Sequence, residues 1–451
     1  MATLASFTNA LNYPALLRQF ACTLLHLCFG TVYAWSFFQV LIVKHLNWSF
    51  TDTSIAFGVT IFSLGMSAAW AGIMLPKMGP RKLALLGSVL FCLGYFIASW
   101  ALANDSLMVF YIGYGFIGGT GLRFGYVTPV ATVANWFPNH KGLATGIVTM
   151  GFGLGALFLS KFLAAILLVN TGEDLSTVFF QLGVVFACIL LPCSLLVVNP
   201  PKSKESEKKP IATLELLERD ENDPRYVRKC LSSYEFIIMW LIFFFNIAAG
   251  ISVISFQSPL LQDVWHMNDS TIEPELLAIY GANLIAISSV FNGLGRLFFG
   301  LLSDHIGRVA VFRILLASQT VVFGILMTER DPWIFSILVC YIMLCFGGGF
   351  ATMPSFVLDV FGAKRMSTLY GLILTAWAFA GVIGPLYVGY LKDNYPDRVV
   401  IYCFLIGVTF LSVGFIVSML LSNDHIRLHK PSVEETMLKL NIPFPKAQKT
   451  N

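Results

Sequence analysis

Long uninterrupted apolar runs are the feature that most restricts how this chain can fold. Two of them, Leu83–Ala103 and Val399–Leu421, contain no charged residue. As an α-helix, each is long enough to cross the roughly 30 Å hydrocarbon core of a lipid bilayer. Only 12% of the residues are charged, about half the proportion that is usual in soluble domains. The sequence therefore predicts an all-α, polytopic membrane protein.

Twelve apolar spans follow one another along the chain. They cover residues 17–43, 52–75, 83–103, 107–134, 142–168, 176–198, 235–261, 276–302, 309–328, 333–358, 367–391 and 399–421. The polar stretch between the sixth and seventh spans contains the run KSKESEKKP and has the composition of a flexible linker. We therefore predict an N-terminal six-helix half (1–198), a cytoplasmic linker (199–234), a C-terminal six-helix half (235–421) and a cytoplasmic tail (422–451).

The distribution of Lys and Arg indicates the orientation of these spans. If the N-terminus is cytoplasmic, that side carries a large basic set: Lys77, Arg81, Lys82, Lys141, Arg308, Arg313, Lys364, Arg365 and the basic residues of the linker and tail. The opposite loops carry few basic residues and several acids, namely Glu173, Asp174, Asp263, Asp269, Glu273 and Glu275. Because cytoplasmic loops are enriched in positive residues, both termini are predicted to be cytoplasmic.

The two halves contain related turns. The turn after the second span reads GIMLPKMGPRK from Gly72, and the turn after the eighth reads GLLSDHIGR from Gly300. The sequence WFPNHKGLATG from Trp136 is echoed by VFGAKRMSTLYG from Val360. Two related six-helix halves are typical of a transporter whose substrate site lies between them.

An arginine lies inside the eighth span. Arg296 belongs to the sequence NGLGRLFFG, and that span contains no carboxylate near it. A guanidinium at membrane depth costs about 2.5–3.5 kcal/mol on insertion scales, so it requires a water-filled cavity, a partner or a ligand. The interpretation that we favour is contact with a transported anion. The alternative is that Arg296 locks a cytoplasmic gate through the turn at Asp304 or a neighbouring helix.

These motifs resemble the major facilitator superfamily and, within it, the oxalate:formate antiporter family. The superfamily signature Gly-x-x-x-Asp-Arg-x-Gly-Arg is closely matched from Gly300 to Arg308, whereas Pro76 stands at its aspartate position in the first half. More specific matches are GTVYAWSFF (30–38), FGYVTPVATVANWFP (124–138), WLIFFFNIAAG (240–250) and NGLGR (292–296). The resemblance implies a pocket for a small carboxylate between the two halves. It also implies a bacterial inner membrane as the location.

The resemblance further implies which side chains surround the carboxylate. In that family an arginine in span eight and a lysine in span eleven hold the charge, and aromatic residues form the wall. Arg296 matches the arginine, Tyr33 and Trp35 match the span-one aromatics, and Tyr126 matches the span-four tyrosine. The lysine is missing, because YGLILTAWAFAG places Trp377 at its position. Each of these aromatic residues could instead serve only for packing.

Arg123 is a candidate for the second positive charge. It lies in GGTGLRFGY, where the family that this chain resembles usually has glycine. It precedes Tyr126 by three residues, so the two side chains share one face of a helix. If Tyr126 faces the pocket, Arg123 faces it too or lies one turn toward the outside. The structural alternative is an arginine that snorkels or pairs with carbonyls at a helix end.

His26, Asp304 and Arg308 complete the candidate residues. His26 lies at the centre of the first span and titrates near neutral pH, so it could couple protons or could be a small polar packing residue. Asp304 and Arg308 are expected to fix helix ends rather than to bind substrate. The deep membrane lacks acids, which argues against cationic substrates and favours exchange or facilitated diffusion over proton symport.

The sequence thus predicts a secondary transporter, and not an enzyme, that moves a small mono- or dicarboxylate by alternating access and mainly by exchange. Three alternatives remain open at this point. They are a proton-coupled monocarboxylate symporter that uses His26, an exporter of hydrophobic compounds, and a non-transporting nutrient sensor. The protein is expected to act as a monomer in the bilayer, without a cofactor, a metal or nucleic acid.

Overall fold

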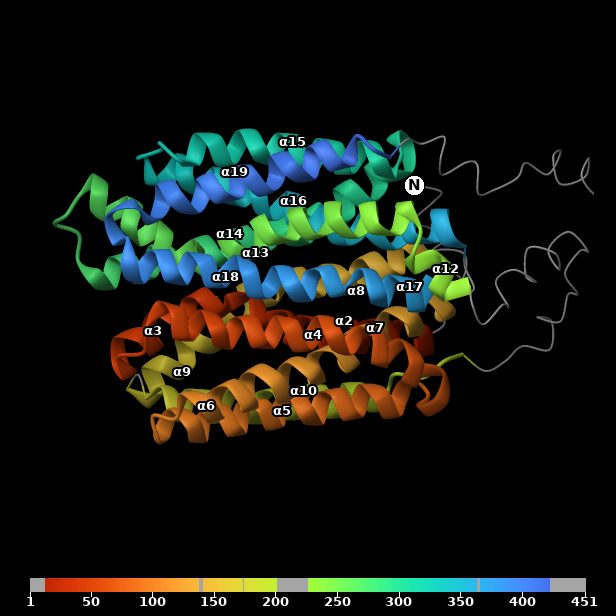
Figure 1. Cartoon of the computed structure of the whole chain (residues 1–451). Coiled ribbons are helices and arrows are strands. Elements are labelled where there is room, and N and C mark those ends of the chain that lie inside the picture. The colour runs from red at the N-terminus through yellow and green to blue at the C-terminus, as the bar shows by residue number, and fades with distance from the viewer. Residues whose placement is uncertain (1–12, 138–140, 173, 201–225, 363–365, 422–451) are drawn as a thin grey trace, which may run out of the picture.

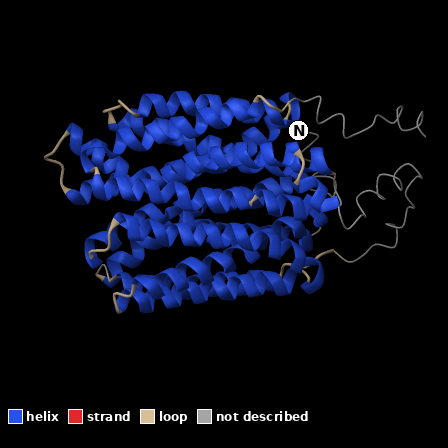
Figure 2. Ribbon diagram, viewed as in Figure 1, coloured by secondary structure: helices blue, strands red, loops and turns tan. Residues whose placement is uncertain are grey.

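A computed structural model describes residues 13–137, 141–172, 174–200, 226–362 and 366–421. Within these ranges the chain is helical and contains no strand, as Figure 2 shows. Most of the predicted linker and the whole predicted tail fall on residues 201–225 and 422–451, which lie outside the described residues.

The first six predicted spans each coincide with a helical segment. The segments are α2 (Tyr13–Phe29) with the 3₁₀ turn η1 (Gly30–Ala34) and α3 (Trp35–Leu46); α4 (Phe50–Met78); α5 (Pro80–Ala103); α6 (Leu107–Phe110) with the π-helical η2 (Tyr111–Gly118) and α7 (Gly119–Trp136); α8 (Lys141–Leu157) with the π-helical η3 (Phe158–Leu163) and α9 (Ala164–Thr171); and α10 (Leu175–Leu195). Three of the six therefore change helix type part-way through the bundle.

The last six predicted spans coincide with helices in the same way. After the short α12 (Tyr226–Leu231) come α13 (Tyr234–Asn268), α14 (Pro274–Ile306), α15 (Arg308–Leu326), α16 (Pro332–Phe361), α17 (Met366–Ile373) with α18 (Thr375–Asn394), and, after the 3₁₀ turn η5 (Pro396–Arg398), α19 (Val399–Ser418). In the described part of the chain, ten helical stretches are long and apolar enough to cross a membrane. The predicted fold class, an all-α polytopic membrane protein, is confirmed, and each of the twelve predicted spans coincides with a helical segment.

Local sequence explains where several helices begin. Before α4, the Ser49 hydroxyl accepts from the Asp52 amide at 2.9 Å, and the Ser49 amide donates to the Asp52 carboxylate at 3.1 Å. This reciprocal pair satisfies amide groups that a helix start would otherwise leave unpaired. Ser233 caps α13 and Asp331 caps α16 by accepting from amides of the first turn.

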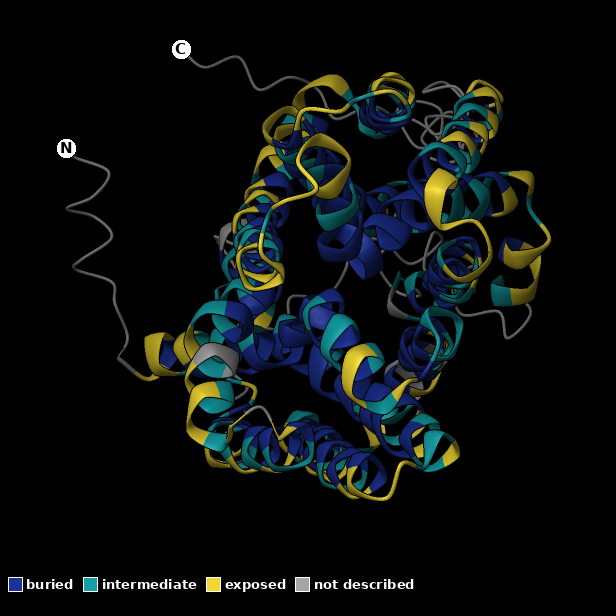
Figure 3. Ribbon diagram, turned by 90° about the vertical axis from the view of Figure 1, so that its left-hand side faces the viewer, coloured by how far each residue is buried: buried dark blue, intermediate teal, exposed yellow. Residues whose placement is uncertain are grey.

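The helices form two groups that lie side by side along the bundle. In Figure 1 the red-to-yellow helices of the first six segments fill the lower part, and the green-to-blue helices of the last six fill the upper part. The two groups meet where α4 packs on α18 and α8 packs on α14. Figure 3, which looks along the bundle, shows that the residues between the groups are mostly buried.

Close backbone contact marks the packing of α8 on α14. Gly153 of α8 lies so near Gly293 of α14 that a Cβ atom on Gly153 would fall 2.8 Å from the Gly293 backbone. One turn away, the Ser289 hydroxyl donates to the Gly153 carbonyl at 2.5 Å and accepts from the Leu157 amide at 3.2 Å. A side chain of the second group thus joins the backbone hydrogen bonding of the first. We call this contact the α8–α14 seam.

The end of the bundle away from α12 is closed by polar contacts between the groups. The Asp393 carboxylate of α18 accepts from the Phe50 and Thr51 amides of α4 at 3.0 and 2.7 Å, and from the Thr51 hydroxyl at 2.5 Å. A carboxylate at a helix N-terminus is favourable because it complements unpaired amides and the helix dipole. From η3, the Lys161 ammonium donates to the Asn283 side-chain carbonyl of α14. These contacts hold the two groups together at this end.

Candidate functional site

Arg296 lies on the buried face of α14, between the two groups of helices. That face repeats at helical spacing through Ile285, Ser289, Asn292 and Arg296, all of which are buried. The Arg296 side chain is only 4% exposed. Because the face meets α8 of the first group, the guanidinium is held at the interface.

Aromatic rings surround the Arg296 guanidinium. Its carbon lies 5.5 Å from the ring centre of Phe152 on α8 and 5.4 Å from that of Phe350 on α16. One of its nitrogens donates to the Tyr126 hydroxyl at 3.4 Å, while its Nε has no hydrogen-bond partner. Aromatic faces attract a cation, but they do not supply the neutralising charge that a carboxylate would.

Arg123 approaches the same tyrosine from α7. Its guanidinium carbon lies 5.2 Å from the ring centre of Tyr126, and its side chain is 2% exposed. Two of its nitrogens, Nε and Nη1, are buried without a hydrogen-bond partner. Tyr126 therefore presents its ring to Arg123 and its hydroxyl to Arg296. The structure thus places the two arginines around one tyrosine.

Neither guanidinium has a carboxylate partner among the residues that the structure describes. The ion pairs found there involve Arg308 and Lys392 instead. A buried charge without a partner is strongly unfavourable, and proteins normally pair it or hydrogen-bond it fully. Two such charges, both with unsatisfied N–H groups, form a site that is electrostatically complementary to an anion.

Tyr33 and Tyr370 complete the polar part of the site. Both lie within electrostatic range of Arg296 and of Tyr126, and Tyr370 is also within range of Arg123. Tyr33 is 2% exposed, and its hydroxyl is turned toward Arg296 without a hydrogen bond of standard geometry. Tyr370 is a site residue that the sequence reasoning missed. It precedes Trp377 by seven residues, two helical turns, and this spacing could have indicated that it faces the same interface.

The ring of Phe350 separates Trp377 from Arg296. Trp377 is 1% exposed, and its ring contacts Phe350 edge-on with a centroid distance of 4.6 Å. Phe350 is in turn one of the rings beside Arg296. Phe346, one turn before Phe350, packs against Tyr33 at 5.7 Å. The position where the resembled family has lysine is thus occupied by an indole that belongs to the aromatic wall.

The structure does not bring Trp35 to this site. Its ring stacks on Tyr114 at 5.2 Å and on Phe57 at 5.9 Å, inside the first group of helices. Trp35 follows Tyr33 by two residues, and residues with that spacing point to different sides of a helix. The two span-one aromatics therefore have different surroundings: Tyr33 faces the arginines, and Trp35 packs within its own half.

His26 is buried directly behind Tyr126. Its ring stacks on the Tyr126 ring at a centroid distance of 4.5 Å, and its Nε2 bonds to the Tyr126 carbonyl at 2.9 Å. The side chain is 0% exposed. His26 thus supports the tyrosine that lies between the two arginines.

Asp304 and Arg308 lie away from Arg123 and Arg296, at the turn between α14 and α15. The Arg308 guanidinium pairs with Asp304 at 2.6 Å and with Asp359 of α16 at 3.2 Å. It also donates to the Ser303 hydroxyl. These contacts connect the ends of α14, α15 and α16, an arrangement that suits the structural part expected of this turn.

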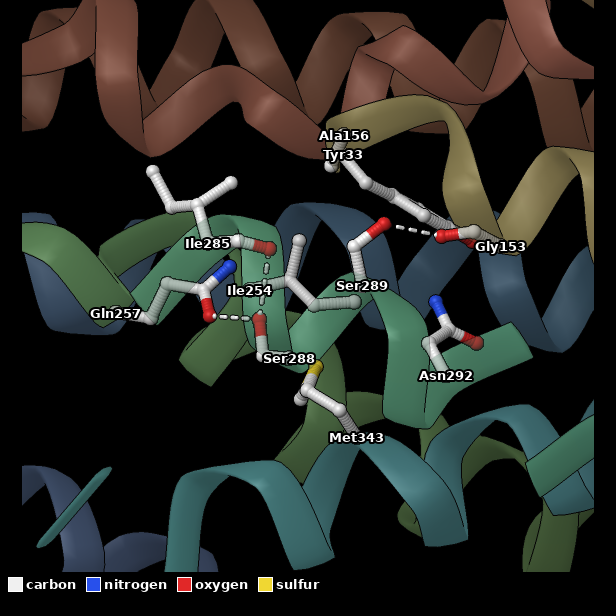
Figure 4. Close-up of a pocket in the computed structure, with 10 residues that line it drawn as sticks. All are labelled: Tyr33, Gly153, Ala156, Ile254, Gln257, Ile285, Ser288, Ser289, Asn292 and Met343. Carbon is white, nitrogen blue, oxygen red and sulfur yellow. Dashed lines mark hydrogen bonds between the residues drawn. The ribbon is translucent and has the colours of Figure 1, made fainter. Parts of the chain in front are cut away.

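A small cavity adjoins the arginine site along α14 (Figure 4). Its lining comes from both groups of helices and consists of Tyr33, Gly153, Ala156, Ile254, Gln257, Ile285, Ser288, Ser289, Asn292 and Met343. Tyr33 belongs both to this cavity and to the surroundings of Arg296. The cavity and the arginine site are therefore neighbouring parts of one interface.

Comparison with known proteins identifies similar sequences and folds. The profile of the Major Facilitator Superfamily matches residues 20–385. The oxalate:formate antiporter of Oxalobacter formigenes is 24% identical over 359 residues, covering 79% of this chain and 79% of that protein. The apicoplast pyruvate carrier 1 of Toxoplasma gondii is 25% identical over 452 residues, covering 80% of this chain and 81% of that protein.

Solved structures share the fold at lower identity. The nucleoside transporter NupG aligns with a TM-score of 0.64 and 12% identity over 90% of this chain and 99% of its own. The D-xylose-proton symporter aligns with a TM-score of 0.64 and 15% identity over 89% of this chain and 97% of its own. Their substrates differ from each other, so these similarities describe the architecture and not the ligand.

Proposed function

The chain belongs to the Major Facilitator Superfamily, and on that basis we propose that it exchanges small organic anions, mono- or dicarboxylates, across a membrane by alternating access. The protein acts as a monomer, and the anion contacts the guanidiniums of Arg123 and Arg296 beside Tyr126. The observation that carries this proposal is the pair of buried guanidiniums without a carboxylate partner in the described structure. Similarity to an oxalate:formate antiporter and to a pyruvate carrier supports the same substrate class.

Exchange follows from the distribution of the two charges. Arg123 belongs to the first group of helices and Arg296 to the second, and Tyr126 lies between them. Two like charges in a medium of low dielectric constant repel each other strongly, so burying both of them without an anion raises the free energy of the empty carrier. A bound carboxylate reverses the sign of that interaction. The loaded carrier therefore changes conformation more readily than the empty carrier, which favours exchange over one-way diffusion.

Counterflow in proteoliposomes tests this function. Vesicles loaded with one carboxylate at high concentration are placed in a trace of the same labelled compound, with formate, lactate, pyruvate, oxalate and malonate tried in turn. We expect transient accumulation of label for at least one of them, and none for uridine or xylose or in protein-free vesicles. If no carboxylate shows counterflow while a neutral solute does, the anion proposal is wrong.

Proton-coupled symport through His26 is the second candidate. The observation that favours it is the position of this buried imidazole against Tyr126, within electrostatic range of both arginines. The same vesicles, loaded with a pH-sensitive dye, separate the two mechanisms. Net carboxylate uptake into empty vesicles, accompanied by acidification of the interior, would establish symport. Uptake that requires a carboxylate inside and leaves the interior pH unchanged establishes exchange.

The proposed orientation predicts the side on which each loop lies. Because basic residues concentrate on one side of the spans, a reporter fused at Lys208 or at the C-terminus should be cytoplasmic in a bacterial inner membrane. A reporter at Asp269, in the turn between α13 and α14, should be external. Paired alkaline phosphatase and fluorescent-protein fusions measure this directly. External activity of the Lys208 fusion would overturn the proposed topology.

A further inference from the structure

The cavity beside the arginine site has a neutral, polar lining. Its polar side chains are Tyr33, Gln257, Ser288, Ser289 and Asn292, and none of them carries a charge. Ser288 donates to the Gln257 side-chain carbonyl at 2.7 Å, and the dashed lines in Figure 4 show this bond and that of Ser289 to Gly153. Both donors and acceptors are therefore available around one small space.

Two polar atoms in this lining lack a hydrogen bond of standard geometry. The Asn292 side-chain oxygen is buried and makes no hydrogen bond. The Tyr33 hydroxyl is turned toward Arg296, but it makes no hydrogen bond of standard geometry. Both residues are 2% exposed. Buried polar atoms normally find a partner, and an unsatisfied one destabilises the structure or marks a ligand-binding position. A hydroxyl group could donate to the Asn292 oxygen, and a hydroxyl or carbonyl oxygen could accept from Tyr33.

The size of the cavity restricts what can enter it. Its volume is about 10 Å³, which is close to the minimum that holds one water molecule. A single oxygen atom of a ligand therefore fits, whereas a second carboxylate does not. A carboxylate would also lack a cation there, because the lining is uncharged, and burying an unpaired charge is strongly unfavourable.

The position of the cavity relates it to the carboxylate site. Asn292 and Arg296 are separated by one turn of α14, which corresponds to about 6 Å along the helix axis. Tyr33 borders both the cavity and the surroundings of Arg296. A ligand whose carboxylate contacts Arg296 would reach the cavity with an atom roughly four or five bonds from the carboxylate oxygen.

We propose that this cavity is a specificity subsite for a neutral oxygen of the transported anion, so that the preferred substrates are hydroxy or oxo carboxylates. The inference rests on the proposed function, since it assigns a second contact to the same ligand. The carboxylate binds at the arginines, and a hydroxyl or keto oxygen further along the carbon chain binds at Asn292, Ser288 and Tyr33. An unsubstituted carboxylate leaves those groups unsatisfied and binds less well.

A series of butyrates with one hydroxyl group tests the subsite. Butyrate and its 2-, 3- and 4-hydroxy derivatives share one carbon chain and differ only in the position of the oxygen. Each is used to inhibit the exchange of the best carboxylate found by counterflow. We expect the 3- or 4-hydroxy compound to bind about tenfold more tightly than butyrate, as one well-placed buried hydrogen bond allows, and the 2-hydroxy compound to gain least.

Two variants and a matched control show whether the cavity causes this preference. Ser288→Ala and Asn292→Ala should each lower the ratio of hydroxybutyrate to butyrate affinity by about fivefold or more. Ser255→Ala is the control, because Ser255 is also a buried serine whose hydroxyl donates to its own helix, at the Ser252 carbonyl, but it does not line the cavity. In this control, the ratio of hydroxybutyrate to butyrate affinity should equal that of the parent protein.

The outcomes separate this inference from the proposed function. If carboxylates are exchanged but every hydroxybutyrate binds like butyrate, the subsite is wrong while the anion function stands. The subsite is also wrong if a clear preference survives in both Ser288→Ala and Asn292→Ala. If no carboxylate is exchanged at all, the proposed function fails and the subsite fails with it.

Discussion

Replacing Arg296 with glutamine is expected to abolish anion exchange, with a loss of about a hundredfold or more. The guanidinium is buried among Phe152, Phe350 and Tyr126, so no water replaces its contact with the ligand. Removing one partner of a buried, hydrogen-bonded charge pair costs roughly 2–5 kcal/mol. Arg296→Lys should also be poor, because an ammonium cannot reproduce the bidentate geometry of a guanidinium on a carboxylate.

The measurement is the initial counterflow rate at equal amounts of reconstituted protein, with a monodisperse gel-filtration peak as evidence of folding. Arg313→Gln is the matched control. Arg313 is a partly buried arginine of α15 that donates to the Ser418 and Leu421 carbonyls, outside the anion site. Transport should persist in that variant. If Arg296→Gln shows the same initial counterflow rate as the parent protein, Arg296 is a gate element without substrate contact.

Removing Arg123 is expected to weaken the binding of dicarboxylates more than the binding of monocarboxylates. Arg123 supplies the second positive charge beside Tyr126, and a dianion depends on both charges. In Arg123→Gly we expect inhibition by oxalate or malonate to weaken at least about tenfold more than inhibition by formate or lactate. Losing both arginines should be far more damaging than losing one, because an anion in a dry site then has no cation at all.

A lysine at position 377 can test whether a second positive charge is what dicarboxylates require. Trp377→Lys, added to Arg123→Gly, should recover part of the dicarboxylate affinity, because Trp377 contacts Phe350, which lies beside Arg296. Competition assays on the single and double variants provide the comparison. If Arg123→Gly transports mono- and dicarboxylates as the parent protein does, Arg123 has a structural role. A monocarboxylate held by Arg296 alone then becomes the preferred substrate.

The fold was largely predictable because the membrane leaves few choices. Inside a bilayer the backbone must satisfy its own hydrogen bonds, so an apolar run of sufficient length becomes a helix. The ranges 83–103 and 399–421 agree with α5 and α19 to within three residues at each end. The changes of helix type at η1, η2 and η3 were not predicted, because they depend on packing between helices.

The site was predictable where charge or helical spacing carried the information. Arg296 and Arg123 stood out because a guanidinium is rare in an apolar span, and the spacing of Arg123 and Tyr126 placed both on one face. Phe152, Phe350 and Tyr370 did not stand out, because the chain has 40 phenylalanines and 15 tyrosines. For such common residues, composition cannot distinguish a wall of the site from ordinary packing, and only the tertiary structure does.

The α8–α14 seam has a consequence for how much sequence variation the chain tolerates beside the cavity, which Gly153 lines. A methyl group on Gly153 would meet the backbone of Gly293 at 2.8 Å, and backbone atoms cannot rotate away from it. A methyl group on Gly293 would meet only the flexible side chains of Met150 and Leu154, at 3.4 Å or more. The two glycines face each other across the seam, yet alanine is compatible with position 293 and forces the helices apart at position 153.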